Sequence, residues 1–345
     1  MGGALLQLVA YGVQDIYLSG NPQITFFKCV YRRHTNFSME SIGQPFTGSN
    51  DFGSSLDLEI PRKGDLIHDM WLQIKLPPAT DVISCDDSTD TSIYRNWINN
   101  IGHGIIDQIS ILIGGQVVDT HIGEWFDIWN ELTDPHKNHF KLLGKKDNYV
   151  LENQDKISRY YVPLIFWFNR YLGQALPLIA LQYHEVSLKL KLKDLKSLII
   201  CNGSNISLSG KISEIILFTN YIFLDIDERK RFAAMSHEYL IEQLQYTKDK
   251  VPAGSNNFKF SFNHPVKELV WIMKHPTRNQ TTDTPVFNSN LTDINGNDWF
   301  NYSSNTENTN LGYGTFDIFN HANILINGNE RFEKRDALYF RQINL

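Results

Sequence analysis

Cysteine is scarce in this chain, and the few that occur are poorly spaced for covalent or metal chemistry. Cys29, Cys85 and Cys201 lie far apart among 345 residues, and no two of them form a Cys-x-x-Cys pair. An odd number of scattered cysteines predicts neither a disulfide framework nor a zinc site. A reducing compartment therefore suits the chain best.

Runs of positive charge and long apolar segments are also missing. The formal net charge is −6, and the one basic run is the short stretch 31–34 (YRRH). Affinity for nucleic acid depends on lysines and arginines that neutralise phosphates, so direct binding to nucleic acid is not expected. The most apolar stretch, residues 161–168, is followed by Asn169 and Arg170, far short of the ~20 residues that a spanning helix needs. We expect no transmembrane segment.

The sequence lacks the common catalytic motifs. It contains no G-x-S-x-G elbow, no phosphate-binding glycine loop and no H-E-x-x-H helix. His136 and His139 could share a helical face, but no third ligand is nearby, and residues 293–298 depart from calcium-loop spacing. The acidic residues of 225–228 fit a helix start, where carboxylates favour the positive end of the dipole. We therefore predict no enzyme, no cofactor and no metal site.

Aromatic and alternating residues are abundant instead. The chain has 21 Phe, 15 Tyr and 7 Trp, side chains that pack well on pleated sheets. Residues 56–60 and 186–192 alternate apolar and polar positions, and residues 69–76 predict a further strand that carries Trp71. The pattern favours a mostly β protein built from antiparallel strands.

A hairpin and two helices complete the local predictions. Residues 109–119 read as two strands joined by Gly114 and Gly115, a turn that tolerates positive φ. Residues 123–132 and 228–245 place large apolar residues on one helical stripe, and Asp227 is positioned to cap the second helix. Short helices between many strands favour a jelly roll over alternating βαβ units.

An internal repeat predicts two related β-domains. The Trp-bearing strand at 66–76 is matched by residues 266–274, and the 109–119 hairpin with its helix is matched by residues 322–330 and 331–341. We predict two consecutive antiparallel β-jelly-roll (sandwich) domains with short helical insertions, divided as an N-terminal arm at 1–24, a first jelly roll at 25–224, a linker helix at 225–246 and a second jelly roll at 247–345.

The second copy looks incomplete at its C-terminus. Few residues follow Gly328, and residues 160–192 of the first copy have no counterpart in it. Unpaired strand edges invite association. We expect either a truncated or interrupted form, or a second domain that another chain completes.

Four segments resemble one known family. Residues 20–37 (GNPQITFFKCVYRRHTNF) strongly resemble the opening of the major capsid proteins of nucleocytoplasmic large DNA viruses, including the iridovirus, phycodnavirus and mimivirus groups. Residues 113–119, 176–186 and 225–232 resemble the same family, and the resemblance covers essentially the whole chain. Chains of this family usually continue well past a segment like 324–341, in agreement with the internal repeat.

The resemblance implies a structural virion protein rather than an enzyme. It implies homotrimers that form pseudo-hexagonal capsomers of an icosahedral capsid, assembled in the host cytoplasm over an internal viral membrane. The N-terminal region would face the capsid interior and contact minor capsid proteins or the membrane surface. The candidate family-motif and assembly residues are Pro22, Phe26, Phe27, Tyr31, Arg32, Arg33, Gly114, Gly115, Asp227 and Arg229.

Three alternatives remain open. A carbohydrate-binding or receptor-binding jelly roll would use Trp299 and Tyr302, two aromatic residues of a long, exposed, Asn-rich loop at 277–314. A cupin-like enzyme would need clustered metal ligands. A minor or degenerate capsid paralogue would contribute little to the lattice. The aromatic residues Trp125, Phe126 and Trp129 could form a sugar-stacking shelf, but helical spacing favours a place in the core.

Overall fold

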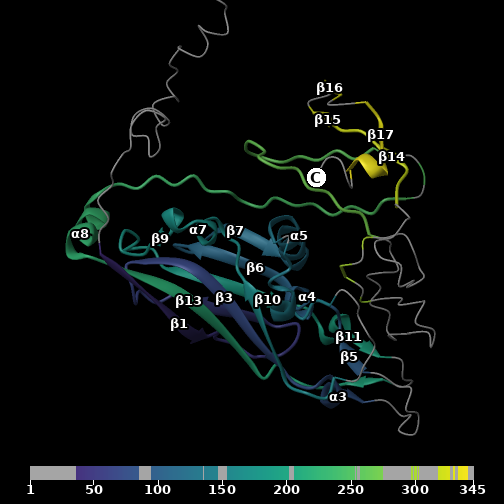
Figure 1. Ribbon diagram of the computed structural model, residues 1–345, viewed down its shortest axis with the longest axis horizontal. Helices are drawn as coiled ribbons and strands as arrows, with labels where there is room; N and C mark the ends of the chain where they lie inside the picture. Colours follow the sequence, from purple (N-terminus) through teal and green to yellow (C-terminus); the bar gives the residue numbers. More distant parts are fainter. Residues whose placement is uncertain are drawn as a thin grey trace, which may run out of the picture.

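Two antiparallel sheets packed face to face form the body of the protein (Figure 1). The computed structural model describes residues 36–84, 95–134, 136–146, 154–201, 206–252, 254, 257–274, 297, 299–300, 302, 318–326, 329–330 and 333–340. The mostly β, antiparallel fold class is thereby confirmed.

The strand order of the sandwich is that of a jelly roll. The first sheet has the order β1-β13-β3-β8, with β9 also paired to β3, and the second has the order β2-β10-β6-β7. Numbered along the chain, the eight main strands run 1-8-3-6 and 2-7-4-5, so early and late strands are neighbours in both sheets, as in two interlocked Greek keys. Their bounds are β1 Phe37–Pro45, β2 Ser55–Glu59, β3 Leu66–Leu76, β6 Ile106–Ile113, β7 Gln116–Ile122, β8 Ser158–Pro163, β9 Leu176–Pro177, β10 Val186–Leu192 and β13 Glu214–Leu224.

Alternating side chains build the core between the sheets. Along β10, Leu188 and Leu190 point inward and are buried, while Lys189 and Lys191 are exposed. The central strand β3 is buried over most of its length because it has neighbours on both edges. Each fully buried Leu or Ile side chain stabilises the fold by about 1.5–3 kcal/mol.

The predicted hairpin and first helix are confirmed. Strands β6 and β7 are joined by Gly114 and Gly115, whose φ angles of 59° and 79° favour glycine at this turn. Helix α5 (Gly123–Thr133) follows β7 and buries Phe126 in the core. Strand β13 was not among the predicted strands, although it lies in the interior of the first sheet.

Short elements fill the connections of the sandwich. Strands β4 and β12 pair with each other, as do β5 and β11. The bounds of these elements are α3 Ala79–Val82, β4 Ile83–Ser84, β5 Arg95–Trp97, α4 Ile101–Gly104, α6 Phe140–Leu143, α7 Trp167–Arg170, η2 Leu172–Gln174, η3 Leu195–Leu198, β11 Ile199–Cys201 and β12 Ser207–Leu208.

The second predicted helix is shorter than expected. Helix α8 spans Ile226–Ala234, and the chain beyond it is extended rather than helical up to residue 245. The predicted cap is also wrong, since Asp225 is the N-cap and its Oδ1 accepts a hydrogen bond from the Ile226 backbone N–H at 2.8 Å. Asp227 lies in the first turn instead. Contacts with the sandwich hold the following residues extended and outweigh their helical pattern.

The described residues after α8 contain two small ladders. Strand β14 (His321–Ala322) pairs with β17 (Arg335–Asp336), and β15 (Leu325–Ile326) pairs with β16 (Asn329–Glu330), which confirms the hairpin predicted at 322–330. Residues 337–340 are helical, within the predicted 331–341 segment.

The strand predicted at 266–274 is wrong, because these residues form no ladder. Trp271 packs instead against the rings of Phe319 and Phe340, at centroid distances of 5.0 and 5.1 Å.

Candidate functional site: the seam between the sandwich and the C-terminal arm

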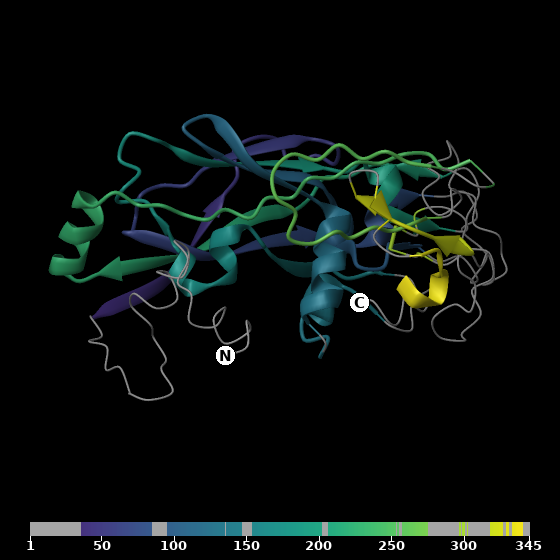
Figure 2. The same ribbon diagram turned by 90° about the horizontal axis from the view of Figure 1, so that it is seen from above.

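The described residues of the segment 235–274, which is called the arm below, run in extended form along one side of the sandwich (Figures 1 and 2). Side-chain and backbone hydrogen bonds attach the arm. The Tyr239 hydroxyl donates to the Ala175 carbonyl at 3.1 Å, and the Leu244 backbone N–H donates to Asp119 Oδ1 at 3.1 Å. Arg170 of α7 forms an ion pair with Glu242. The arm is therefore fixed to the sandwich at several points.

A buried glutamate organises the charges along this contact. Glu124 lies in the first turn of α5, and its side chain is 7% exposed. Its Oε1 lies 3.2 Å from Lys248 Nζ and 3.6 Å from Lys274 Nζ, both on the arm. Burial alone would raise the pKa of Glu124, but the positive charges of Lys193, Lys274 and Lys248 outweigh burial and hold that pKa at about 2. Glu124 is therefore ionised and shared by both halves of the molecule.

The buried Lys193 and the half-buried Lys274 both lie close to the Trp299 ring. Lys193 Nζ lies 3.8 Å from the centroid of this ring, and Lys274 Nζ lies 5.8 Å from it. Burial lowers the pKa of Lys193 to about 8 despite the opposing charge of Glu124, and it lowers the pKa of Lys274 as well. Within the described residues, neither Nζ makes a hydrogen bond. The aromatic face and the Glu124 charge together compensate these cations.

Asp127 forms the second centre of the contact, one turn along α5. Its Oδ1 accepts hydrogen bonds from Lys145 Nζ at 2.8 Å and from Asn100 Nδ2 at 2.9 Å. The Tyr302 hydroxyl donates to Asp127 Oδ2 at 3.3 Å. Burial raises the pKa of Asp127 and also that of Tyr302, so the phenol keeps its proton and remains a donor.

These residues form one connected cluster of charged and aromatic side chains. The seam cluster, as it is called below, comprises Glu124, Asp127, Lys145, Lys193, Lys248, Lys274, Trp299 and Tyr302. A buried ion cluster adds little net stability compared with apolar packing, but removing one partner leaves an uncompensated charge. The cluster therefore favours one position of the C-terminal segments on the sandwich.

The structure corrects the prediction for Trp299 and Tyr302. Both were expected to be exposed in a loop, yet both are half-buried in the seam cluster, and Trp299 Nε1 donates to the Ser197 carbonyl at 2.8 Å. Their aromatic faces are occupied by lysines. Most of the 277–314 loop lies outside the described residues.

The other candidate residues lie in separate places. Gly114 and Gly115 form the β6–β7 turn, and Arg229 on α8 reaches Asp65, with 2.9 Å between Nε and Oδ1. Their roles in assembly, and that of Asp227, remain predictions. The remaining candidates lie outside the described residues: Pro22, Phe26, Phe27, Tyr31, Arg32 and Arg33.

Sequence reasoning missed the charged members of the seam cluster. Lys193 continues the alternating series of Lys189 and Lys191, so no local signal marked it as buried. The partners of Glu124 on the arm are distant in sequence, and no local spacing connects them. Only the folded chain brings these residues together.

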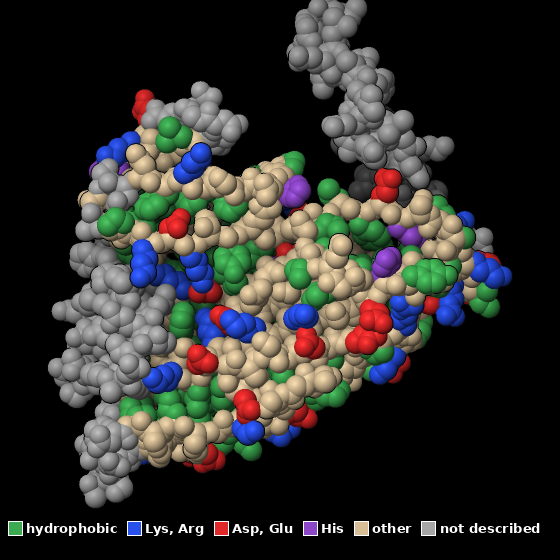
Figure 3. All heavy atoms as spheres, turned by 180° about the vertical axis from the view of Figure 1, so that it is seen from behind, with side chains coloured by type: hydrophobic (Ala, Val, Ile, Leu, Met, Phe, Trp, Pro, Cys, Tyr) green, Lys and Arg blue, Asp and Glu red, His purple; other side chains and the backbone are tan. Residues whose placement is uncertain are grey.

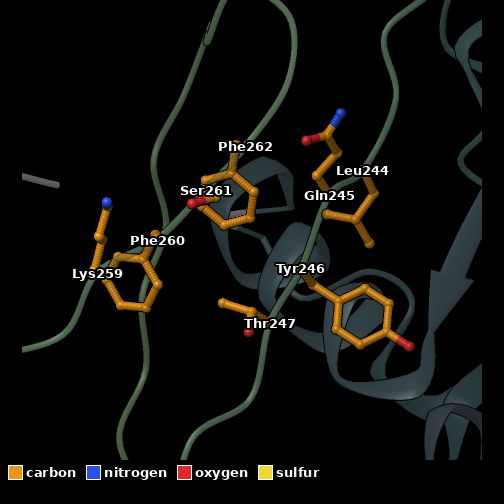
Figure 4. Close-up of a pocket in the computed structure, with 8 residues that line it drawn as sticks. All are labelled: Leu244, Gln245, Tyr246, Thr247, Lys259, Phe260, Ser261 and Phe262. Atoms are coloured by element: carbon orange, nitrogen blue, oxygen red, sulfur yellow. The ribbon is translucent and has the colours of Figure 1, made fainter. Parts of the chain in front are cut away.

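The arm exposes a row of large apolar side chains. Residues 244–247 and 259–262 line a hollow of about 570 Å³, where the Phe260 and Phe262 rings stack with centroids 6.2 Å apart (Figure 4). Asn263 donates its backbone N–H to Gln245 Oε1 at 2.9 Å and so links the two passes of the arm. The exposed apolar residues of the arm include Leu240, Ile241, Tyr246, Val251, Phe258, Phe260, Val266, Leu269, Val270 and Ile272.

In the described part of the chain, no group of three or more His, Cys, Asp or Glu residues could hold a metal ion. None of the helices described there has both the length and the apolar composition of a membrane-spanning helix.

The strand order is that of a jelly roll, and a charged cluster fixes the arm to it. These features place the chain in the class of structural β-sandwich proteins. The family model for the N-terminus of major capsid proteins matches residues 25–225, and the model for major capsid proteins of large eukaryotic DNA viruses matches residues 228–344. The chain belongs to the major capsid protein family of large eukaryotic DNA viruses.

Individual relatives agree with the family models. The major capsid protein of Pyramimonas orientalis virus is 42% identical over 99% of this chain and 75% of its own length. Capsid protein 1 of Acanthamoeba polyphaga mimivirus is 45% identical over 79% of this chain, a match that covers 49% of that relative. The solved PBCV-1 virus capsid has a subunit with a TM-score of 0.70 and 32% identity, covering 93% of this chain and 76% of that one. The expected resemblance and the structural capsid role are confirmed.

Proposed function

We propose that three copies of this chain form a pseudo-hexagonal capsomer, and that these capsomers tile an icosahedral capsid. The observation that carries the proposal is the row of exposed apolar side chains on the arm, beside a sandwich that buries its own apolar residues in a core. Soluble monomers rarely expose contiguous apolar patches larger than a few hundred Å². A second copy of the chain would remove this surface from water.

The energetics favour a large, permanent interface. Obligate interfaces commonly bury roughly 2,000–5,000 Å² and are more apolar than transient ones. Two related β-domains per chain would give a trimer approximate six-fold symmetry, so that one building block fills a hexagonal lattice. This proposal includes the division into jelly rolls at 25–224 and 247–345, with a separate N-terminal segment at 1–24 and the linker at 225–246.

Further partners follow from the same proposal. The N-terminal region, with Phe26, Phe27, Arg32 and Arg33, would contact minor capsid proteins or the internal viral membrane. Acidic and basic side chains are interspersed on the face shown in Figure 3, which does not favour direct contact with nucleic acid. We place the protein in the virion after assembly in the host cytoplasm, without catalytic activity.

Sedimentation of the purified chain at micromolar concentration tests the trimer. We expect a trimer, and we expect the double variant Val266→Asp and Leu269→Asp to shift it towards monomer, because both side chains are exposed on the arm. Tyr183→Asp is the matched control, since Tyr183 is 93% exposed on the sandwich and should leave the trimer intact. A mainly monomeric wild-type chain would contradict the proposal.

A further inference from the structure

A pocket of about 380 Å³ opens on the sandwich between β3, α5 and α7, and none of its lining residues belongs to the seam cluster. This volume lies within the range of small-molecule sites, roughly 300–1,000 Å³. Its floor is formed by the buried side chains of Met70, His103, Phe126 and Leu164. The family role described above gives this pocket no function.

The rim of the pocket combines aromatic rings with polar groups. Trp71 meets the His139 ring edge-on at a centroid distance of 5.8 Å, and Tyr171 is 67% exposed. Aromatic faces of this kind pack against apolar C–H surfaces, while neighbouring polar groups fix the orientation of a ligand. The rim therefore suits a ligand that has both a C–H face and hydroxyl groups.

One polar group of the pocket has unused hydrogen-bonding capacity. Asn130 is 93% buried, and its Nδ2 lacks a partner among the described residues. Nearby, Asp134 Oδ2 accepts from the His139 backbone N–H at 3.1 Å and lies 3.2 Å from His139 Nδ1, which fixes the carboxylate at the pocket. A buried amide donor without a partner costs about 1–3 kcal/mol, so a ligand that satisfied it would gain affinity.

The charges of the pocket argue against ionic ligands. Asp69 and Asp134 both line it and repel anions. His103 adds no positive charge, because burial, with the nearby charges of Lys145 and His139, lowers its pKa to about 3. A cation meets a different obstacle, since the Arg170 guanidinium already covers the Trp129 ring at 4.1 Å. A neutral, hydroxyl-rich ligand remains.

We propose that this pocket, with Trp71 and Tyr171 as stacking surfaces and Asn130, Asp134 and His139 as hydrogen-bonding groups, binds a neutral saccharide. The proposal does not depend on the capsomer, because every residue of the pocket lies on the sandwich.

Ligand-observed saturation-transfer NMR on the full chain tests the proposal. The probes are the methyl glycosides of glucose, galactose, mannose and N-acetylglucosamine. Asp134→Asn should weaken binding of the glycoside about tenfold, because a neutral amide replaces the charged acceptor. Trp71→Leu should abolish the signal, and Asp134→Asn, a milder change, keeps the test valid if Trp71→Leu does not fold.

Tyr183→Ala is the control, because it removes an exposed aromatic ring outside the pocket. Its binding should stay within twofold of wild type. Absence of transfer to all four glycosides would overturn the proposal, as would an equal loss of signal in Tyr183→Ala. Binding of n-butylammonium in place of any glycoside would also overturn it, and would assign the pocket to a lysine of a partner protein.

Discussion

The strand β3 and the segment 266–274 carry the same Trp-bearing pattern but have different structures. Strand β3 pairs with β13, β8 and β9, and its apolar residues enter the core. Residues 266–274 have no ladder partner among the described residues, and several of their apolar side chains are exposed. Alternation therefore specifies which side of a strand is apolar, whereas neighbouring strands must supply the hydrogen bonds that make it a strand.

The two regions should differ most in how much stability is lost when an apolar side chain is truncated. Leu72→Ala, in the fully buried part of β3, should lower the free energy of unfolding by about 4 kcal/mol, because it leaves a cavity in the core. Leu269→Ala, at an exposed arm position, should change it by less than about 0.5 kcal/mol. Urea unfolding at a protein concentration below assembly measures both. Equal losses would show that the arm has a core of its own.

The second-largest expected effect is the loss of stability when a charge of the seam cluster is removed. Glu124→Gln should destabilise the docked arm by about 3 kcal/mol, because Lys193 and Lys274 would keep buried charges without their counter-ion. Hydrogen exchange of residues 240–248 should accelerate while β3 stays protected. Lys248→Gln, whose side chain is 63% exposed, is the control and should have an effect below about 1 kcal/mol. Unchanged hydrogen exchange in Glu124→Gln would show that the seam cluster does not hold the arm on the sandwich.

The stability of the seam should also depend on pH in two windows. Glu124 has a folded pKa of about 2 and an ordinary value of 4.5, so its contribution is present above pH 4.5 and is lost as the pH falls towards 2. Lys193 has a folded pKa of about 8 and an ordinary value of 10.5, so its cost is present below pH 8 and is relieved as the pH rises towards 10.5.

Thermal unfolding across pH measures these two contributions. Glu124→Gln should flatten the acid limb of the profile, and Lys193→Met should flatten the alkaline limb. Profiles that keep their wild-type shape in both variants would show that these groups do not control the arm.

The smallest effect lies at the junction of the two regions. Asp225→Ala should lower stability by about 0.5–1 kcal/mol, because Asp225 caps α8. Asp227→Ala should lower it less, since Asp227 interacts with the helix dipole from the first turn without capping it. Circular dichroism with urea titration compares the two variants. A larger loss of stability in Asp227→Ala than in Asp225→Ala would show that Asp227 is the cap.

Local patterns predicted much of the sandwich. Strand β10 occupies the predicted residues 186–192, and the Gly114-Gly115 turn and helix α5 occur where their residue types require them. These features depend on short-range geometry. The end of α8 was not predictable, because the extended conformation of residues 235–245 is held by contacts such as Leu244 with Asp119.

The seam cluster could not be predicted for a related reason. Glu124 gains its role from Lys248 and Lys274, residues more than a hundred positions away in the chain. Trp299 and Tyr302 were recognised as unusual aromatic residues, but their burial depends on Lys193 and Asp127. Side-chain type showed that these residues mattered, and only the fold showed what they contact.

Quantitative mass spectrometry of purified particles of the virus that encodes this chain tests the central claim most directly. A shell-building subunit must be present in very many copies, so the account predicts that this protein is among the most abundant in the particle. A trace amount, or its absence from the particle, would contradict the account and assign the chain a minor role.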